Sequence, residues 1–242
     1  MLTSSKMKSL FYSPIRWEAK NNEILFWGCL HWHHNPKWDI PIWKRRGFDS
    51  VEEHDEAIVK NWNSKASDKT TGFLLGDTMF GYGGQEEFVK LMRRLKFRRL
   101  FVMSGNHNAG WKQTFEAVQD NVFYIDGKIA REAQGLPLKE VIFVPNYLEA
   151  YINGQPIVMC HYPVLSWNGA GKGSWMLFSH VHGSLGNSEL GRMYLKDGGY
   201  NLEVSVEVNP FPLTYGEIAA IMRNKPKFKT DHHDENGSTP FS

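Results

Sequence analysis

Five short segments of this 242-residue chain contain side chains that bind metals, and an apolar run of strand length precedes each of them. In an open α/β sheet, ligands bind beyond the carboxyl ends of the strands, so segments that lie far apart in the sequence can meet there. Imidazole, carboxylate and amide groups gathered at one place suit a pair of divalent transition-metal ions. The segments are Cys29-Leu30-His31, Gly76-Asp77, Gly105-Asn106-His107, His161 and His180-Val181-His182.

The apolar runs are mostly continuous, which is typical of strands buried on both faces between helical layers. Two amphipathic helices lie between the first three runs. One begins after Ser50, which has capping-box spacing to Glu53, and the other covers Gln85–Phe97. The order strand, helix, strand, helix, strand over residues 24–103 predicts βαβ units and a parallel sheet. The runs are Ile24–Trp27, Gly72–Leu75, Leu100–Met103, Val122–Ile125, Val141–Val144, Ile157–Cys160 and Trp175–Phe178.

Later in the chain strands dominate and helical patterns become sparse, so we expect a second, more antiparallel sheet packed against the first. A final helix is predicted near Tyr215–Arg223, and Pro226 marks the end of the ordered chain. We therefore expect a single domain over residues 1–225 and a polar, aperiodic, flexible tail over residues 226–242.

The composition argues against several classes of protein. The net charge of +2 does not indicate a nucleic-acid or membrane partner. No stretch approaches the ~20 apolar residues that span a bilayer, and residues 1–17 lack the apolar core of a signal peptide. The two cysteines are too few for a disulfide framework, which favours a reducing compartment. We expect a cytosolic protein with no membrane partner.

The order of the five segments resembles the calcineurin-like metallophosphoesterases, whose pattern is D-x-H, G-D, G-N-H-D/E, H and G-H-x-H. The similarity extends to the small bacterial and phage members that lack a cap domain, and it covers roughly residues 24–220. The resemblance implies a four-layer αββα sandwich, in which two mixed β-sheets lie face to face with helices outside. The further matching segments are His31-Trp32-His33-His34-Asn35, Ser50-Val51-Glu52-Glu53, Asn61-Trp62-Asn63 and Cys160-His161-Tyr162-Pro163.

The resemblance also implies two divalent ions, of manganese, iron, zinc or nickel, which share one bridging ligand. The residues that would hold the first ion are Cys29, His31, Asp77 and His182. The residues that would hold the second ion are Asp77, Asn106, His161 and His180. A hydroxide that bridges the two ions would attack phosphorus in line. His107, which is no ligand in the family, would stabilise the transition state and protonate the leaving oxygen.

Three positions depart from the family pattern: Cys29 stands in place of an aspartate, Asn108 in place of an acid, and Ser179 in place of a glycine. The change at Ser179 is expected to be minor. As a thiolate, Cys29 would keep the negative charge of aspartate but favour zinc and iron. Alternatively the first ion binds weakly, or His33 or His34 takes over as a ligand. A buried thiol that only packs in the core is a further alternative.

The predicted function is metal-dependent hydrolysis of a phosphate ester, with phosphodiesters slightly favoured. The partner would be a phosphorylated small molecule or a nucleotide. Because no cap covers the site, nucleic-acid ends could also enter, so a nuclease is one alternative. A metal-poor pseudoenzyme that binds a phosphorylated ligand or a protein is another, motivated by Cys29 and Asn108. The residues expected to contact the substrate are His33, His34, Asn35, Arg45 and Arg46.

Two basic segments leave alternatives open. The cations of the helix over Gln85–Phe97 could grip phosphates, but a solvated helix face is the preferred interpretation. The segment Trp32–Arg46 interleaves tryptophans with cations and could stack bases, although packing over the core explains it equally well. In either case this segment follows the first metal-binding residues, and we expect it to shape the rim of the site.

Overall fold

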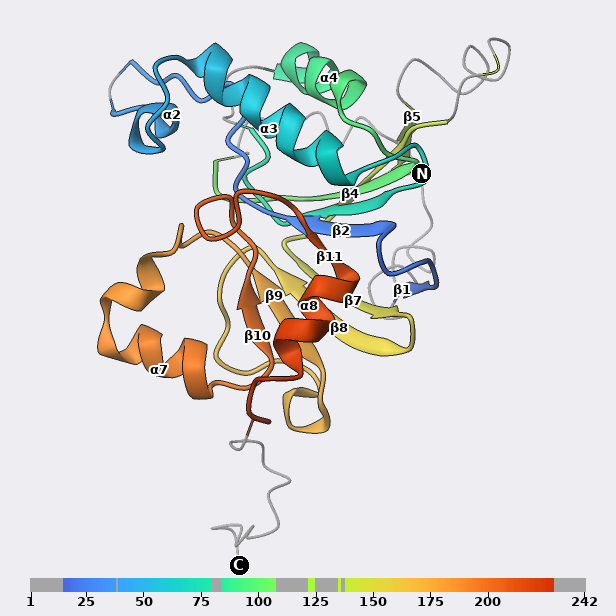
Figure 1. The fold of residues 1–242 in the computed structure, drawn as a ribbon, viewed down its shortest axis with the longest axis vertical. Helices are drawn as coiled ribbons and strands as arrows, with labels where there is room; N and C mark the ends of the chain where they lie inside the picture. Colours follow the sequence, from blue (N-terminus) through green and yellow to red (C-terminus); the bar gives the residue numbers. More distant parts are fainter. Residues whose placement is uncertain are drawn as a thin grey trace, which may run out of the picture.

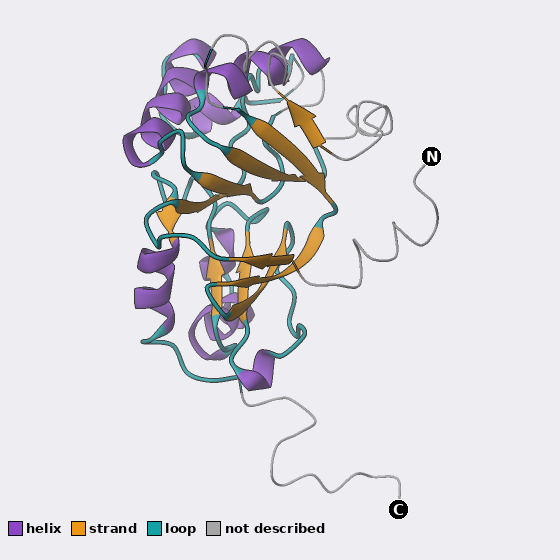
Figure 2. Cartoon of the chain, turned by 90° about the vertical axis from the view of Figure 1, so that its right-hand side faces the viewer, coloured by secondary structure: helices purple, strands orange, loops and turns teal. Residues whose placement is uncertain are grey.

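The computed structural model of the chain describes residues 15–37, 39–79, 84–107, 122–124, 135 and 138–228. Two β-sheets lie face to face with helices outside, as two perpendicular views show (Figure 1 and Figure 2). The predicted four-layer αββα sandwich is therefore confirmed.

The first sheet has a parallel centre and antiparallel edges. Its strand order is β11-β2-β3-β4-β6-β5, and the predicted parallel arrangement of β2, β3 and β4 is confirmed. Every residue of β2 and β3 is buried, because a helical layer covers one face and the second sheet covers the other. The strands are β2 (Ile24–Trp27), β3 (Thr71–Leu74), β4 (Arg99–Met103), β6 (Glu140–Val144), β5 (Val122–Tyr124) and β11 (Leu213–Thr214).

Helix α3 (Val51–Lys65) begins where the sequence predicts, but its cap differs in detail. The Ser50 hydroxyl accepts the N–H of Glu53 at 3.1 Å. The Glu53 carboxylate accepts the N–H of Asp49 at 2.9 Å, so the predicted capping box closes one residue earlier. A short helix, α2 (Ile42–Arg45), precedes it.

The helix predicted over Gln85–Phe97 is α4 (Gly84–Arg94), which ends three residues before Phe97. The Lys139 ammonium donates to the carbonyl oxygens of Met92, Arg93 and Leu95 at 3.3, 3.0 and 2.6 Å. A buried cation over the last carbonyl groups stabilises the end of a helix, which accounts for this boundary.

The second sheet contradicts one expectation. Its strand order is β1-β7-β8-β9-β10, and among these described strands only β7 and β8 pair antiparallel. The prediction of a more antiparallel second sheet is therefore wrong. The connections after β8 and β9 are long crossovers that return the chain in the same direction, and the second contains α7 (Glu189–Asp197), which the sequence analysis missed. The strands are β1 (Ile15–Trp17), β7 (Tyr147–Ile152), β8 (Gln155–Cys160), β9 (Trp175–Phe178) and β10 (Asn201–Glu203); the crossovers also hold the 3₁₀ turns η2 (Ala170–Lys172) and η3 (Ser184–Asn187).

Three hydrophobic clusters hold the layers together. The first joins α3 and α4 to the first sheet and includes Trp27 and Leu91. The second lies between the sheets and includes Phe26 and Met159. The third covers the outer face of the second sheet and includes Phe178. Each sheet is thus buried on both faces, which gives the strand ends a rigid base.

The helix predicted near Tyr215–Arg223 is α8 (Tyr215–Met222), and Thr214 and Glu217 form a complete capping box at its start. Phe228, which the sequence analysis assigns to the polar tail, is buried against Trp167. Residues 229–242 lie outside the described residues, so the single domain and its tail stay a prediction. No helix in the described part of the chain is long and apolar enough to cross a membrane.

Candidate metal centre

Loops from both sheets meet at one end of the sandwich. They follow β2, β3 and β4 of the first sheet and β8 and β9 of the second. Hydrogen bonds join them within each sheet, from the N–H of Cys29 to the carbonyl oxygen of Gly76 at 3.2 Å and from the N–H of Ser179 to that of His161 at 3.1 Å. The N–H of His180 donates to Cys29 Sγ at 3.1 Å across the two sheets, and the N–H of His107, after β4, donates to Asp77 Oδ1 at 2.9 Å. The structure thus brings the five metal-binding segments together.

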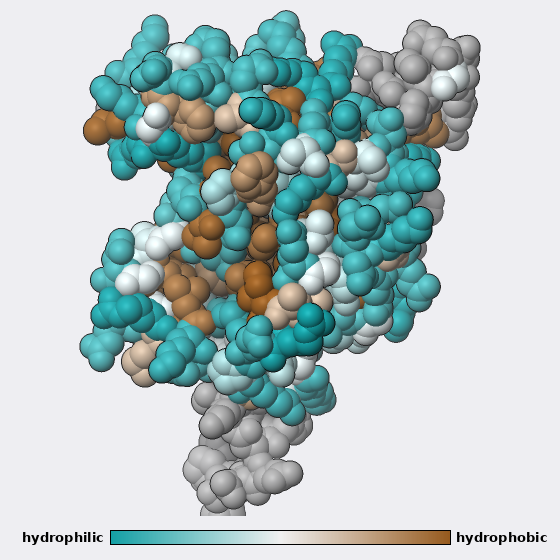
Figure 3. Space-filling view, in the orientation of Figure 1, coloured by the Kyte–Doolittle hydropathy of each residue, from teal (hydrophilic) through white to brown (hydrophobic). Residues whose placement is uncertain are grey.

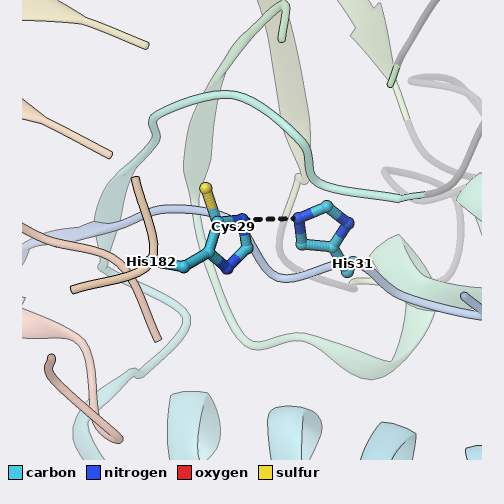
Figure 4. Close-up of side chains that lie close together, drawn as sticks. All are labelled: Cys29, His31 and His182. Atoms are coloured by element: carbon cyan, nitrogen blue, oxygen red, sulfur yellow. Dashed lines mark hydrogen bonds between the residues drawn. The ribbon is translucent and has the colours of Figure 1, made fainter. Parts of the chain in front are cut away.

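The first ligand group consists of Cys29, His31 and His182, whose ligand atoms lie within 4.8 Å of one another. The two imidazoles face each other with their Nε2 atoms 3.2 Å apart, and the thiol lies beside them (Figure 4). A thiolate and two imidazoles form a donor set that suits zinc or iron(II).

The second ligand group consists of Cys29, Asp77 and His161, again within 4.8 Å of one another. Asp77 Oδ2 lies 3.3 Å from His161 Nε2, and that nitrogen also lies 2.9 Å from Asn106 Oδ1. The same Asp77 oxygen is 3.9 Å from His31 Nε2. The carboxylate therefore lies close to both groups, as a shared ligand must.

Two further predicted site residues lie around these groups instead of within them. The N–H of His180 donates to Cys29 Sγ at 3.1 Å, and its ring packs on that of His161 with the centroids 4.9 Å apart. His107 is exposed, its N–H donates to Asp77 Oδ1 at 2.9 Å, and its ring centroid is 5.3 Å from that of His31. His107 thus stands at the mouth of the site.

Backbone strain is concentrated in the same loops. Among the described residues, seven other than glycine have positive φ, and one of these, Asn153, lies in the turn between β7 and β8. Each such residue costs roughly 1–3 kcal/mol and persists only where the surrounding fold enforces it, most often at functional sites. The other six all lie in the site loops: Cys29 (φ 54°), His31 (52°), His33 (57°), Asp77 (43°), His180 (67°) and His182 (50°).

Two glycines allow the close approach of ligand side chains. Gly76 has φ +78°, and a Cβ atom there would lie 2.1 Å from His161 Nδ1. A Cβ atom on Gly105 would lie 2.1 Å from Asp77 Oδ1. A side chain at either position would displace a ligand of the second group.

We expect Gly105→Ala to weaken metal binding about 10- to 100-fold, because it shifts the Asp77 carboxylate from its place. Competition with a chromogenic chelator measures this affinity. Gly186→Ala is the matched control, since a Cβ atom there meets nothing within 4 Å, and its affinity should equal that of the wild type. Equal affinities for Gly105→Ala and the wild type would contradict the placement of Asp77.

The electrostatics prepare two ligands in their metal-binding forms. Burial on its own would raise the pKa of Asp77, but the contacts with the His161 imidazole and the His107 N–H outweigh it, so this pKa lies below its usual range. Burial lowers the pKa of His31 well below its usual range, and the Arg46 guanidinium acts in the same direction. The site therefore presents a carboxylate and a neutral imidazole at neutral pH.

Cys29 is different, because burial raises the pKa of its thiol well above the usual range. The Ser179 side chain opposes this shift, the charge of Asp77 adds to it, and the N–H of His180 opposes it. Since a thiol ligates metals only as the thiolate, a bound ion must displace its proton.

The donor set fits the metal ions that the family resemblance implies. Asp77 Oδ2 is buried and accepts no hydrogen bond from the described residues. His31 Nδ1 is also buried and has no hydrogen-bond partner among them. A buried carboxylate oxygen without a hydrogen bond is costly, and a coordinated cation would satisfy it.

Glu207 and Arg46 hold His182 and the loop after β2 in place. The sequence did not point to Glu207. Glu207 Oε1 lies 2.6 Å from His182 Nδ1 and accepts from Arg46 Nε and Nη2 at 2.9 and 2.7 Å. Arg46 also donates to the carbonyl oxygens of Cys29 and Leu30 at 2.7 and 2.9 Å. Carboxylates that orient a ligating imidazole tune metal affinity. Arg46 was expected at the substrate rim. It lies instead under the loop after β2, with 7% of its side chain exposed.

The support extends into helix α3. His54 Nε2 lies 2.7 Å from Arg46 Nη1, and His54 Nδ1 lies 3.0 Å from Asp55 Oδ1. Asp55 accepts the N–H of His33 at 3.1 and 3.2 Å. An acid and a histidine among apolar residues on one helix face, Asp55 and His54, were the feature of the sequence that could have revealed this supporting role. Nothing comparable marks Glu207.

Ser179 is also more than a minor replacement of glycine. It is fully buried, its hydroxyl donates to the Leu75 carbonyl oxygen, and it lies 3.0 Å from His161 Nδ1. It therefore orients a ligand of the second group. A Cβ atom on Gly28 would lie 2.6 Å from the Ser179 Cβ, so Gly28 provides the space for it.

His33 and His34, which follow His31 in the loop after β2, lie outside both ligand groups. Half of the His33 side chain is exposed. His34 is buried, and its Nδ1 accepts the N–H of Ile42 at 3.0 Å. Burial lowers the pKa of His34 to about 4, and its ring centroid is 5.4 Å from that of His31. The structure thus places His34 as a neutral neighbour of the first group.

The remaining rim residues are exposed. Asn35 Oδ1 lies 3.5 Å from Trp43 Nε1, and Arg45 pairs with Asp39 at 3.2 Å. Figure 3 shows the molecule hollowed at its left edge, between the parts that carry α2 and α7. These helices follow the loops of Cys29 and His182, so the hollow adjoins the loops of the first ligand group.

The described parts of the two basic segments favour a solvated helix face and packing over the core, not phosphate binding or base stacking. Lys90 pairs with Glu87 and Arg94 with Glu56, both at 2.6 Å, as on a solvated helix face. Trp32 is buried under Arg94, which favours packing over base stacking. Trp38 and Asn108, to which the sequence analysis also gives roles, lie outside the described residues.

Comparisons with known proteins support the fold and give no activity. No protein-family model matches the chain. The uncharacterized protein MJ1445 of Methanocaldococcus jannaschii is 29% identical over 76 residues, which cover 31% of this chain and 42% of that protein's length. The crystal structure of AQ665, a protein of unknown function from Aquifex aeolicus, matches with a TM-score of 0.51 and 16% identity. This match covers 82% of this chain and 98% of AQ665, and it shows that the two folds are alike.

Proposed function

We propose that this protein is a metal-dependent phosphoesterase that hydrolyses a phosphate ester, with phosphodiesters slightly favoured over monoesters. The observation that carries the proposal is the pair of adjacent ligand groups where the two sheets meet. Divalent ions held there would neutralise phosphate charge and lower the pKa of a coordinated water. The order of the motifs along the sequence adds the resemblance to the calcineurin-like metallophosphoesterases.

The residues around the ligand groups divide the work. Asp77 would hold the metal ions, and its Oδ1 fixes the backbone of His107 by accepting its N–H. His107 stands exposed at the mouth beside the first group, where its imidazole can protonate the leaving oxygen. Asn106, also exposed, adds an amide oxygen to the second group.

The substrate we propose is a phosphorylated small molecule or a nucleotide in the cytosol. His33, Asn106 and His107 are exposed, and the hollow beside the loops would give a phosphorylated ligand access to them (Figure 3). Both cysteines are free and buried, which fits a reducing compartment.

The test is metal analysis of the purified protein together with hydrolysis of bis(p-nitrophenyl) phosphate and p-nitrophenyl phosphate in manganese, nickel, zinc and magnesium. We expect at least one ion per chain and a rate above background, greater for the diester. Less than one ion per chain after reconstitution, with no rate above background, would overturn the proposal.

A second candidate is a metal-poor pseudoenzyme that binds a phosphorylated ligand or a protein. The raised pKa of the Cys29 thiol favours it, because the first ion must compete with a proton for this ligand. The same metal analysis separates the candidates. If the substrate is instead a nucleic-acid end, DNA affinity should fall steeply with salt, and a flat dependence would exclude this variant.

A further inference from the structure

The thiol of Cys29 lies where the two ligand groups adjoin. Its sulfur is within 4.8 Å of the ligand atoms of His31 and His182, and also within 4.8 Å of those of Asp77 and His161. Cys29 is the residue that these two groups have in common, and it is fully buried. In Figure 4 the Cys29 side chain, from the loop after β2, lies beside the imidazole of His182.

We infer that the Cys29 thiolate is a ligand shared by both metal ions, beside Asp77. This inference rests on the proposed two-ion site and gives position 29 a role that the resemblance does not, since there it serves the first ion alone. A sulfur–zinc bond is ~2.3 Å long, so two such bonds span up to ~4.6 Å. They can therefore bridge ions that lie roughly 3.5–4 Å apart.

The surroundings of the sulfur suit a bridging anion. The N–H of His180 donates to it at 3.1 Å, and such a hydrogen bond stabilises charge on a ligating thiolate. Asp77 places a second anionic ligand next to it in a buried site. Two adjacent buried anions repel each other unless cations lie between them. On metal binding, the thiol releases one proton to solvent and the sulfur bonds the ions.

A shared sulfur extends the metal preference to both positions. Thiolate ligands favour zinc, iron(II) and cobalt over manganese and magnesium. If Cys29 served one ion, the other position would hold only nitrogen and oxygen ligands and would accept manganese readily.

Cobalt(II) titration of the metal-free protein tests this inference without turnover. Sulfur-to-cobalt charge transfer absorbs in the near ultraviolet, apart from the d–d bands that any cobalt site shows. We expect two equivalents to bind and the charge-transfer band to grow with both. Growth that stops at one equivalent, binding of fewer than two equivalents, or no such band would each overturn the inference.

Variants of Cys29 sharpen the result. Cys29→Ser should abolish the band and weaken both cobalt-binding steps at least tenfold, whereas Cys160→Ser, at the other buried cysteine, should change neither. Cys29→Asp, which retains a negative ligand should the serine variant fold poorly, should lose the band and bind manganese more tightly. Loss of affinity confined to one step would contradict a shared thiolate.

The outcome is distinguishable from failure of the proposed function. A protein that binds two cobalt ions with the band in both steps, yet hydrolyses no phosphate ester, would refute the phosphoesterase and retain the bridge. Hydrolysis by a protein without the band would refute the bridge alone.

Discussion

Asp77→Asn is expected to lower kcat/KM for a phosphodiester by at least about 10³-fold, which corresponds to about 4 kcal/mol of transition-state stabilisation. Asp77 is the carboxylate of the second ligand group, and its Oδ2 is buried within reach of His31 and His161. The substitution preserves the oxygen that accepts the N–H of His107. It replaces the other oxygen by an amide nitrogen, which cannot ligate a cation. Steady-state kinetics and metal content measure the effect.

The control for this substitution is Asp68→Asn, which changes an exposed aspartate remote from the ligand groups. It should leave activity, metal content and stability as in the wild type. An Asp77→Asn protein that keeps both its metal content and its full activity would show that Asp77 is not a ligand shared by the two ions.

Arg46→Lys is expected to weaken metal binding about 10- to 100-fold and to destabilise the metal-free fold by about 3 kcal/mol. The guanidinium joins Glu207, the carbonyl oxygens of Cys29 and Leu30, and His54 in one fixed geometry. An ammonium group cannot make these bonds together, because it lacks the planar array of donors. Chelator competition and urea unfolding of the metal-free protein measure the two effects separately.

Arg45→Lys is the matched control, since the neighbouring arginine is exposed and pairs with Asp39. We expect it to change stability by less than about 0.5 kcal/mol and to leave metal affinity unchanged. Equal effects of the two substitutions would show that Arg46 does not support the loop after β2.

Glu207→Gln should resemble Arg46→Lys in metal affinity, because it removes the charge between Arg46 and His182.

Much of the fold was predictable, because buried strands and amphipathic helices leave local patterns. The run Ile24–Trp27 became β2, and the residues at Phe88 and Leu91 became the buried face of α4. The predictions were wrong where connections determine the geometry. Strand β9 and strand β10 are parallel because α7 returns the chain between them, and nothing in a strand's own sequence records which way its neighbour runs.

The candidate site was likewise predictable only in part. Candidate ligands such as His31 and His182 could be named in advance, since each residue type has its own chemistry and follows a strand end. Their support could not. Glu207 lies in an irregular segment after β10, 161 residues from Arg46 in sequence, and only the packing of the two sheets brings them within 2.7 Å. Ser179 resembled a tolerated change until its hydroxyl was placed against His161.

By itself, the sequence determined the order of buried strands, the chemical kind of the ligands and the presence of a thiol where a carboxylate is expected. These properties are local, because they depend on residue types and on spacing along one segment. Only the tertiary structure decided which of these side chains lie together, that Arg46 lies beneath the site instead of at its rim, and that Cys29 belongs to both ligand groups. Those properties depend on distances between segments far apart in the chain, and the packing of two sheets against each other sets these distances.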